Sequence, residues 1–237
     1  MSANAEVLHQ SDLMGSSVQE AVLKQYQAPP RTADWNPAEF AREQIRGLVR
    51  RVFFSADAQP VKQVVISAAE AHIEVSAICE QVGRALALET DADVAIVGQN
   101  LHDAQIATLH ANRYTGVSAI KSQSTRTTGN LWRVSEFCLR ERGKELGTGH
   151  YWLSRLSELR NEFEYCVIQG PTPGISNETA VLGELADGII LVLDAHSTRR
   201  VTARKIKESL ESGRSRILGT VLSGRTFPVP DCLYRRL

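Results

Sequence analysis

The side chains best suited to chemistry lie in a short loop between a strand pattern and a helix pattern. Residues 64–87 read VVISAAEAHIEVSAICEQVGRALA, and their loop carries Glu70, His72, Glu74 and Ser76. A loop that leads from a strand into a helix can hold a phosphate on its backbone N–H groups. Such loops use glycine for close approach and lysine for charge, and this loop has neither. The stretch is therefore a nucleotide site, a degenerate nucleotide site, or an ordinary connection between a strand and a helix.

A second group of polar residues follows a later apolar strand. Asp194 and His196 end the run GIILVLDAH, and Thr198 and Arg199 open the helical pattern behind it. Because parallel sheets bind ligands beyond the carboxyl ends of their strands, Asp194 is a candidate displaced carboxylate, and a purely structural role is the alternative. Thr198 is expected to cap the following helix. The sequence contains no GxSxG nucleophile motif and no HExxH metal motif.

Composition restricts the class of protein. The chain has 237 residues, 43% of them hydrophobic, which is enough for a folded core. Lys and Arg number 27, as do Asp and Glu, so net charge favours neither nucleic acid nor an anionic membrane. No apolar run reaches membrane-spanning length and no secretory signal opens the sequence, so we expect a cytoplasmic protein. The scattered cysteines are expected to be reduced and structural: Cys79, Cys138, Cys166 and Cys232.

Strand and helix patterns alternate along most of the chain. Apolar strands are expected at 63–68, 93–99, 131–137, 165–170, 188–195 and 216–223. Helices are expected at 37–54, 74–88, 150–163, 177–186 and 198–213, with a short helix near 103–111. The polar stretch 121–130 is expected to be a mobile loop or, alternatively, a loop that binds an anionic partner. Continuous apolar strands separated by helices predict an α/β three-layer sandwich with a mostly parallel sheet. Residues 1–35 are expected to form a mobile arm, and residues 36–237 the folded domain.

Several segments resemble the bacterial tyrosine kinases of capsule and exopolysaccharide synthesis, which are ParA/MinD-like P-loop proteins. ADGIILVLD resembles the family's laDgvilVv strand, STRR its next helix start, and YCVIQGPTP its yviiDtPP segment. EQIRGLVRRVFF resembles the arginine-bearing helix that serves subunit contact in that family. The resemblance covers roughly residues 38–237. It implies a P-loop NTPase-like fold, a place in exopolysaccharide synthesis, and ATP with Mg²⁺ as the cofactors of active members.

The chain departs from this family at the positions that do chemistry. The pattern GxxxxGK[ST] falls on residues 69–76, where Ala69 and Glu74 replace the glycines, Val75 replaces the lysine, and only Ser76 fits. The aspartates of the other two carboxylate motifs are replaced at these positions: Gly98, Asn100 and Gln169. The family's tyrosine-rich tail is reduced to Tyr234.

These replacements remove the charges that phosphoryl transfer needs. A carboxylate about 4 Å from a phosphate costs about 4 kcal/mol at an effective dielectric of 20, or about a thousandfold in affinity. We therefore expect no catalytic residue, no metal, and no ATP binding in the family's manner. We also hypothesise that Glu70 or Glu74 fills the vacated phosphate site, the alternative being that both are solvated carboxylates at a helix start. Ser76 is then a helix-start hydroxyl and His72 an exposed loop residue.

The sequence thus predicts a catalytically degenerate scaffold or regulator in exopolysaccharide synthesis and export. By resemblance, its partner would be a membrane-spanning polysaccharide co-polymerase or another protein of that machinery, which would recruit it to the inner face of the plasma membrane. No nucleic-acid partner is expected. Glu43, Arg46 and Arg50 resemble the family's subunit-contact charges, although Val49 stands where the last arginine belongs. Self-association and a solvated charged face are both open interpretations of this helix.

Two other functions remain open. The first is an unconventional but active ATP-dependent tyrosine kinase or ATPase of the same pathway, which would recruit Lys62, Arg199 or a cation from its partner. The second is a regulator that senses another small ligand in the old cleft, independently of nucleotide.

Overall fold

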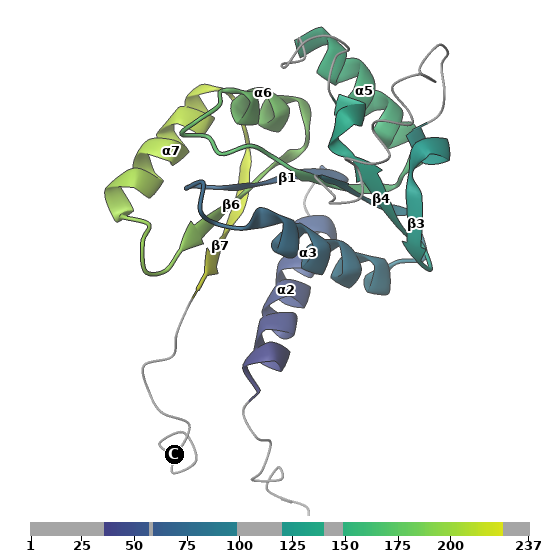
Figure 1. Ribbon diagram of the computed structural model, residues 1–237, viewed down its shortest axis with the longest axis horizontal. Coiled ribbons are helices and arrows are strands. Elements are labelled where there is room, and N and C mark those ends of the chain that lie inside the picture. The colour runs from purple at the N-terminus through teal and green to yellow at the C-terminus, as the bar shows by residue number, and fades with distance from the viewer. Residues whose placement is uncertain (1–35, 57–58, 99–119, 140–148, 225–237) are drawn as a thin grey trace, which may run out of the picture. The chain divides into compact units, whose positions relative to one another are not determined.

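A seven-stranded sheet forms the centre of the structure (Figure 1). This computed structural model describes residues 36–56, 59–98, 120–139 and 149–224. All of these residues except 36 and 37 belong to one compact unit, residues 38–237. The strands are β1 (Gln63–Ala68), β2 (Val94–Gly98), β3 (Thr125–Thr128), β4 (Leu131–Ser135), β5 (Tyr165–Gln169), β6 (Gly188–Asp194) and β7 (Ile217–Ser223). Their order is β3-β4-β2-β5-β1-β6-β7, and all neighbours are parallel except β3 and β4, which are antiparallel.

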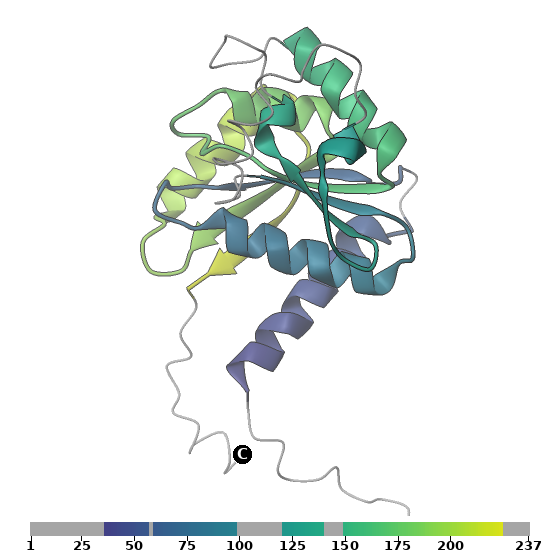
Figure 2. The same cartoon turned by 45° about the vertical axis from the view of Figure 1, so that its right-hand side comes forward.

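Helices cover both faces of this sheet (Figure 2). They are α2 (Pro37–Phe53), α3 (Val75–Glu89), α5 (Gly149–Glu162), α6 (Glu178–Leu185) and α7 (Arg200–Ser212), with the 3₁₀ helices η1 (Ile120–Gln123) and η2 (Glu136–Leu139). Helices α2 and α3 lie on one face, and α5, α6 and α7 on the other. An apolar core lies between the sheet and the helices on each face. The side chains of β1 alternate between the two cores: Val64 and Ile66 pack on the side of α2 and α3, and Val65 packs on the side of α5, α6 and α7. The predicted α/β sandwich with a mostly parallel sheet is confirmed.

A polar network fixes the amino end of the central strand β1. The Asp187 carboxylate accepts hydrogen bonds from the backbone N–H groups of Lys62 (2.8 Å) and Gln63 (2.7 Å). Its other oxygen accepts a hydrogen bond from the Arg160 guanidinium at 2.7 Å. The buried Gln63 side chain accepts a hydrogen bond from Arg160 (2.9 Å) and donates one to the Leu156 carbonyl (2.8 Å). The aspartate of the ADG segment therefore joins β1, α5 and the start of β6.

The polar stretch 121–130, for which the sequence predicts a mobile loop, is ordered by backbone and side-chain contacts. It contributes to η1 and forms the edge strand β3. The Glu162 carboxylate accepts hydrogen bonds from the backbone N–H groups of Ile120 (2.8 Å) and Lys121, and the Lys121 ammonium pairs with Asp93. All four residues of β3 are exposed, so the strand has no apolar alternation that could reveal it in the sequence.

Some predictions concern residues outside the described ranges. They include the arm at 1–35, and the division at residue 36 therefore stays a prediction. The same holds for the short helix near 103–111, for Cys232 and for Tyr234.

Replacing the carboxylate of the amino-end network should destabilise the fold. We expect Asp187→Ala to lower the free energy of unfolding by about 2–3 kcal/mol, because it removes a charged acceptor from two strand N–H groups and from Arg160. Asp91→Ala is the control, because Asp91 is exposed, and it should change stability by less than about 0.5 kcal/mol. Urea denaturation measures both values. Equal effects of the two substitutions would contradict the structural role of Asp187.

The buried cysteines should be chemically inert in the folded protein. Burial raises the pKa of Cys79 and of Cys166 to about 12, so almost no thiolate exists at pH 8. We expect iodoacetamide to alkylate both thiols only after unfolding, as read for each cysteine by peptide mass spectrometry. The same reaction in guanidinium chloride is the control. Rapid alkylation of either thiol in the native protein would show that the reagent reaches that thiol without unfolding.

Candidate functional site

The loop between β1 and α3 lies at the carboxyl edge of the sheet, where parallel sheets bind ligands. The Ala69 N–H donates to the Val192 carbonyl at 2.9 Å, which extends the pairing of β1 with β6. The Ile73 N–H donates to the Glu70 carbonyl at 3.2 Å and closes a turn. Among the described non-glycine residues only Arg214 has a positive φ, so this loop uses ordinary L-residue backbone angles. It needs no glycine because its backbone nowhere enters the left-handed region.

Two apolar side chains of the loop are part of the protein core. Val75, which the resemblance aligns with the family's phosphate-binding lysine, is 6% exposed, and Ile73 is 8% exposed. Both belong to the apolar cluster that also contains Cys79, Ile190 and Val192. The loop is thus held inward by burial of apolar surface, which is the reverse of a loop that wraps an anion.

The helix behind the loop begins without a capping side chain. Glu74 occupies the N-cap position of α3 in an extended conformation and makes no side-chain cap hydrogen bond. Its carboxylate instead accepts a hydrogen bond from the Ser76 hydroxyl at 3.1 Å. The hypothesis that Glu74 fills the phosphate site on the N–H groups of this helix is therefore wrong for this structure. Ser76 is a helix-start hydroxyl, as predicted.

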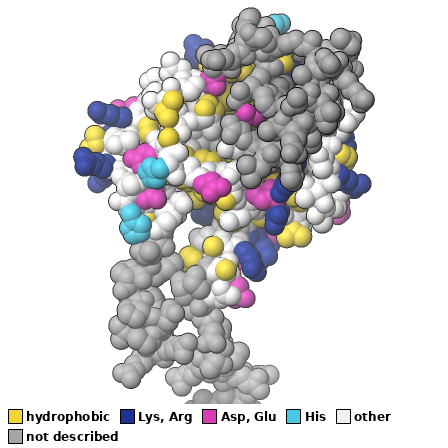
Figure 3. Space-filling view, viewed as in Figure 1, with side chains coloured by type: hydrophobic (Ala, Val, Ile, Leu, Met, Phe, Trp, Pro, Cys, Tyr) yellow, Lys and Arg dark blue, Asp and Glu magenta, His cyan; other side chains and the backbone are white. Residues whose placement is uncertain are grey.

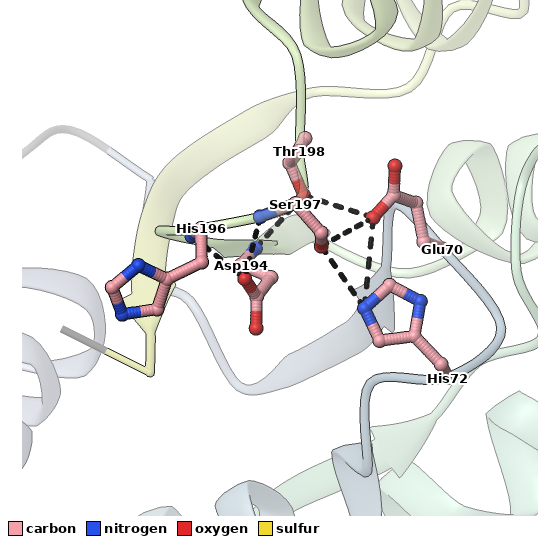
Figure 4. A network of polar contacts seen from close by, with 6 residues as sticks. All are labelled: Glu70, His72, Asp194, His196, Ser197 and Thr198. Atoms are coloured by element: carbon pink, nitrogen blue, oxygen red, sulfur yellow. Dashed lines mark hydrogen bonds and ion pairs between the residues drawn. The ribbon is translucent and has the colours of Figure 1, made fainter.

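Glu70 turns away from α3 and toward the loop that follows β6 (Figure 4). Its carboxylate accepts hydrogen bonds from the hydroxyls of Ser197 (2.9 Å) and Thr198 (3.4 Å). His72 Nε2 lies 3.0 Å from the same Ser197 hydroxyl and 3.7 Å from the carboxylate. We call Glu70, His72, Ser197 and Thr198 the loop clasp, because they join two loops that are about 127 residues apart in sequence.

The loop clasp is not arranged like a catalytic triad. In a triad the acid holds the ring nitrogen opposite the one that faces the nucleophile. Here Glu70 approaches the same His72 nitrogen that contacts Ser197, so the carboxylate does not orient the ring toward the hydroxyl. The arrangement supports a structural link and gives no basis for a nucleophilic Ser197.

Asp194 stabilises a turn after β6. Its carboxylate accepts hydrogen bonds from the backbone N–H groups of His196 (2.7 Å) and Ser197 (2.8 Å), and these bonds hold the pKa of Asp194 below its usual range. The Thr198 hydroxyl accepts a hydrogen bond from the Asp194 N–H at 2.9 Å. The expected cap at Thr198 is therefore wrong, and Arg199 is the N-cap residue of α7, without a side-chain cap.

Gly98 of β2 and Gln169 of β5, where the resemblance places carboxylates of the family, pack against each other. Gly98 is buried, and a Cβ atom there would lie 2.7 Å from the Gln169 Oε1. The Gln169 side chain therefore occupies the space beside Gly98 that a side chain at position 98 would need. Asn100, the third of these positions, lies outside the described residues.

The charged residues of α2 are tied within the same chain. Arg46 pairs with Glu43 at 2.9 Å, and Arg50 forms a bidentate pair with Glu89 of α3 at 3.0 and 3.2 Å. The Glu89 partner raises the pKa of Arg50 above its ordinary value. Val49 is fully buried in the core beneath them. The helix thus uses its family-like arginines for internal packing in the monomer, which neither requires nor prevents self-association.

Lys62 does not belong to this site. It precedes β1 at the amino end of the strand and pairs with Glu164 at 2.7 Å, so the suggestion that it replaces the missing lysine is wrong. No cluster of three or more His, Cys, Asp or Glu suited to a metal ion occurs in the part of the chain that the structure describes. Within those same ranges, none of the helices is long and apolar enough to cross a membrane.

Sequence reasoning missed two features of the site. Ser197 belongs to the STRR segment, which indicated only a helix start, and its pairing with Glu70 joins residues that only the completed sheet brings together. The burial of Ile73 and Val75 had a visible signal, since two apolar residues stand in a loop that would otherwise be polar.

Comparison with known proteins gives both sequence and structural relatives. No family model matches the chain. The tyrosine-protein kinase CpsD of Streptococcus agalactiae serotype III is 32% identical over 73 residues, which cover 31% of this chain and 32% of CpsD. The match thus spans about a third of the length of this curated relative.

Among solved structures, the chimerical protein CapA2B2 superposes with a TM-score of 0.62 at 18% identity, covering 76% of this chain and 83% of that one. The kinase domain of the Escherichia coli tyrosine kinase ETK gives 0.60 at 15% identity, with 85% and 84% covered. The MinD cell division protein of Aquifex aeolicus gives 0.51 at 16% identity, with 68% and 69% covered. The predicted ParA/MinD-like fold is confirmed.

Placing a lysine at the core position of the loop should be costly. We expect Val75→Lys to lower the free energy of unfolding by about 2 kcal/mol, because the ammonium would have to leave an apolar cluster or be buried in it. Ala77→Lys, on the exposed face of the same helix turn, is the matched control and should change stability by less than about 0.5 kcal/mol. Thermal unfolding and denaturant titration of both variants measure the two changes in the free energy of unfolding. A neutral Val75→Lys would mean that the loop opens easily enough to accept the family's lysine.

Proposed function

We propose that the chain is a member of the bacterial tyrosine-kinase family, which its partial match to CpsD and its fold support, and that it acts as a catalytically degenerate scaffold or regulator in exopolysaccharide synthesis and export. The sequence match covers only part of the relatives, so the proposal depends on the site rather than on their names. The observation that carries it is the burial of Val75 in the core at the position of the phosphate-binding lysine.

The other positions of the site support the same conclusion. A nucleotide with Mg²⁺ needs a cation on its phosphates and a carboxylate behind the metal. Gly98 and Gln169 provide no charge, and they are packed against each other. Glu74 places a carboxylate at the helix start, where it would oppose a phosphate. The residues present therefore do not fit ATP–Mg²⁺ held as the family holds it, and we assign the chain no cofactor.

A scaffold role requires a partner. We propose a membrane-spanning polysaccharide co-polymerase or another protein of the same machinery, with this chain at the cytoplasmic face of the membrane. The exposed side chains of α2 that surround Glu43 and Arg46 offer one surface for self-association. Arg50 contributes less to such a surface because Glu89 already binds its guanidinium.

An active kinase or ATPase is the alternative, and the kinase names of the relatives favour it. It would need a cation from elsewhere, either Arg199 at the start of α7 or a residue of a partner, together with the retained Ser76 hydroxyl. A regulator that senses another small ligand at the same edge would bind neither ATP nor ADP. Mass spectrometry of ligands that co-purify with the chain would detect it.

Nucleotide titration separates these functions. We expect isothermal titration of the chain with ATP–Mg²⁺ and with ADP to give no binding tighter than about 1 mM, because the lost lysine and the gained carboxylate each weaken phosphate binding by orders of magnitude. Anti-phosphotyrosine blots after incubation with ATP should stay blank, with the ETK kinase domain as positive control. Glu74→Gly combined with Val75→Lys tests whether loop chemistry alone accounts for the loss. Micromolar binding or tyrosine phosphate in the unmodified chain would make the alternative the correct function.

A further inference from the structure

Helix α7 carries its charges in an unusual order. Residues 199–207 hold five cations, Arg199, Arg200, Arg204, Lys205 and Lys207, all of them exposed. Its carboxyl-terminal half holds the two carboxylates Glu208 and Glu211. The first turn contains no acidic residue and the last turn no basic residue.

This order opposes the dipole of the helix. The amino-terminal end of a helix is partially positive and favours anions, while its carboxyl-terminal end favours cations. Arg199 is also a poor N-cap residue, and it makes no side-chain cap hydrogen bond. The arrangement therefore costs helix stability, and helix stability does not explain why the cations stand there.

Internal ion pairing does not explain the cations either. Lys207 pairs with Glu211 at 3.5 Å, one turn further along. The other four make no ion pair with any residue in the described ranges. Two acidic residues of the loops beside the start of α7, Glu70 after β1 and Asp194 at the end of β6, are hydrogen-bonded to hydroxyls and to backbone N–H groups respectively. The guanidinium donors of α7 thus remain available at the surface.

The cations form a short and bounded stripe. Arg200, Arg204 and Lys207 stand at i, i+4 and i+7, which places them on one face of the helix, to one side of the buried Ile206 and Leu210. Glu211 at i+11 ends this face and pairs with Lys207. Figure 3 shows dark blue side chains gathered at the left of the molecule, where Figure 1 places α7. The stretch from 199 to 207 is about 12 Å long at 1.5 Å per residue.

We propose that this face docks a short acidic segment of a partner protein. Arginine forks bind carboxylates in pairs, and three of the five cations are arginines. A segment of a few Asp or Glu residues matches a 12 Å stripe in length and in charge. An anionic membrane surface would be attracted to the same cations, and a vesicle-binding measurement distinguishes it from an acidic segment.

The inference does not depend on whether the chain binds nucleotide, since an active kinase could present the same helix. Its failure and the failure of the scaffold role are therefore distinguishable: nucleotide titration tests one and peptide binding the other.

The test uses the full chain and a fluorescein-labelled hexaglutamate peptide, with binding read by fluorescence anisotropy. We expect the peptide to bind with an affinity that falls as salt rises. Arg200→Gln with Arg204→Gln should raise the Kd about tenfold. The matched control, Arg42→Gln with Arg84→Gln, removes two exposed arginines from α2 and α3 and should leave the Kd within about twofold.

Thermal unfolding of the same variants adds a second measurement. Because the cations oppose the helix dipole, Arg200→Gln with Arg204→Gln should have a Tm at or above that of the unmodified chain. A lower Tm would show that the cations serve the helix itself and would overturn the inference. Equal loss of peptide binding in both double variants, or no peptide binding at all, would overturn it too. So would α7-dependent binding to phosphatidylserine vesicles without binding to the peptide.

Discussion

The first N–H groups of the central strand need an acceptor, and the Asp187 carboxylate provides it. β1 lies between β5 and β6, so its amino end is surrounded by protein and an unpaired N–H there would be costly. Asp187 meets this need at the start of β6 and at the same time holds Arg160, which satisfies the buried amide of Gln63. The network joins the amino end of β1 to the start of β6, and the parallel pairing of these two strands leads from there to the loops at the opposite edge.

At that opposite edge the polar groups are satisfied by one another. The Glu70 carboxylate takes hydroxyl donors from the loop after β6, and Asp194 takes backbone N–H groups of that loop. In a nucleotide-binding relative, phosphate and metal would be the charges to which such loops respond. Here a side-chain link joins the loops directly, while Val75 anchors the first of them in the core. The edge can therefore be ordered without a ligand.

The sequence predicts the parts of this structure that depend on local pattern. Continuous apolar runs identified β1, β5 and β6 to within two residues at each end, and the resemblance identified the fold. The edge strand β3 could not be found in this way, because a strand exposed on both faces has no apolar period. The prediction that Thr198 caps α7 fails for a different reason. Its hydroxyl can cap a helix or accept a hydrogen bond from another nearby N–H, and in the turn at Asp194 it accepts one from the Asp194 N–H. Contacts across about 127 residues, such as that of Ser197 with Glu70, exist only once the sheet has formed.

The buried apolar residues of the loop after β1 and the cations of α7 differ in their physical consequence. Ile73 and Val75 bury apolar surface, so their presence in the loop stabilises the fold and needs no functional explanation. Arg199 and Arg200 at the start of α7 do the opposite, because they stand at the positive end of the helix and form no ion pair within the described ranges. The loop after β1 is thus accounted for by packing within the chain, whereas the exposed cations of α7 are the groups for which we propose a partner outside it.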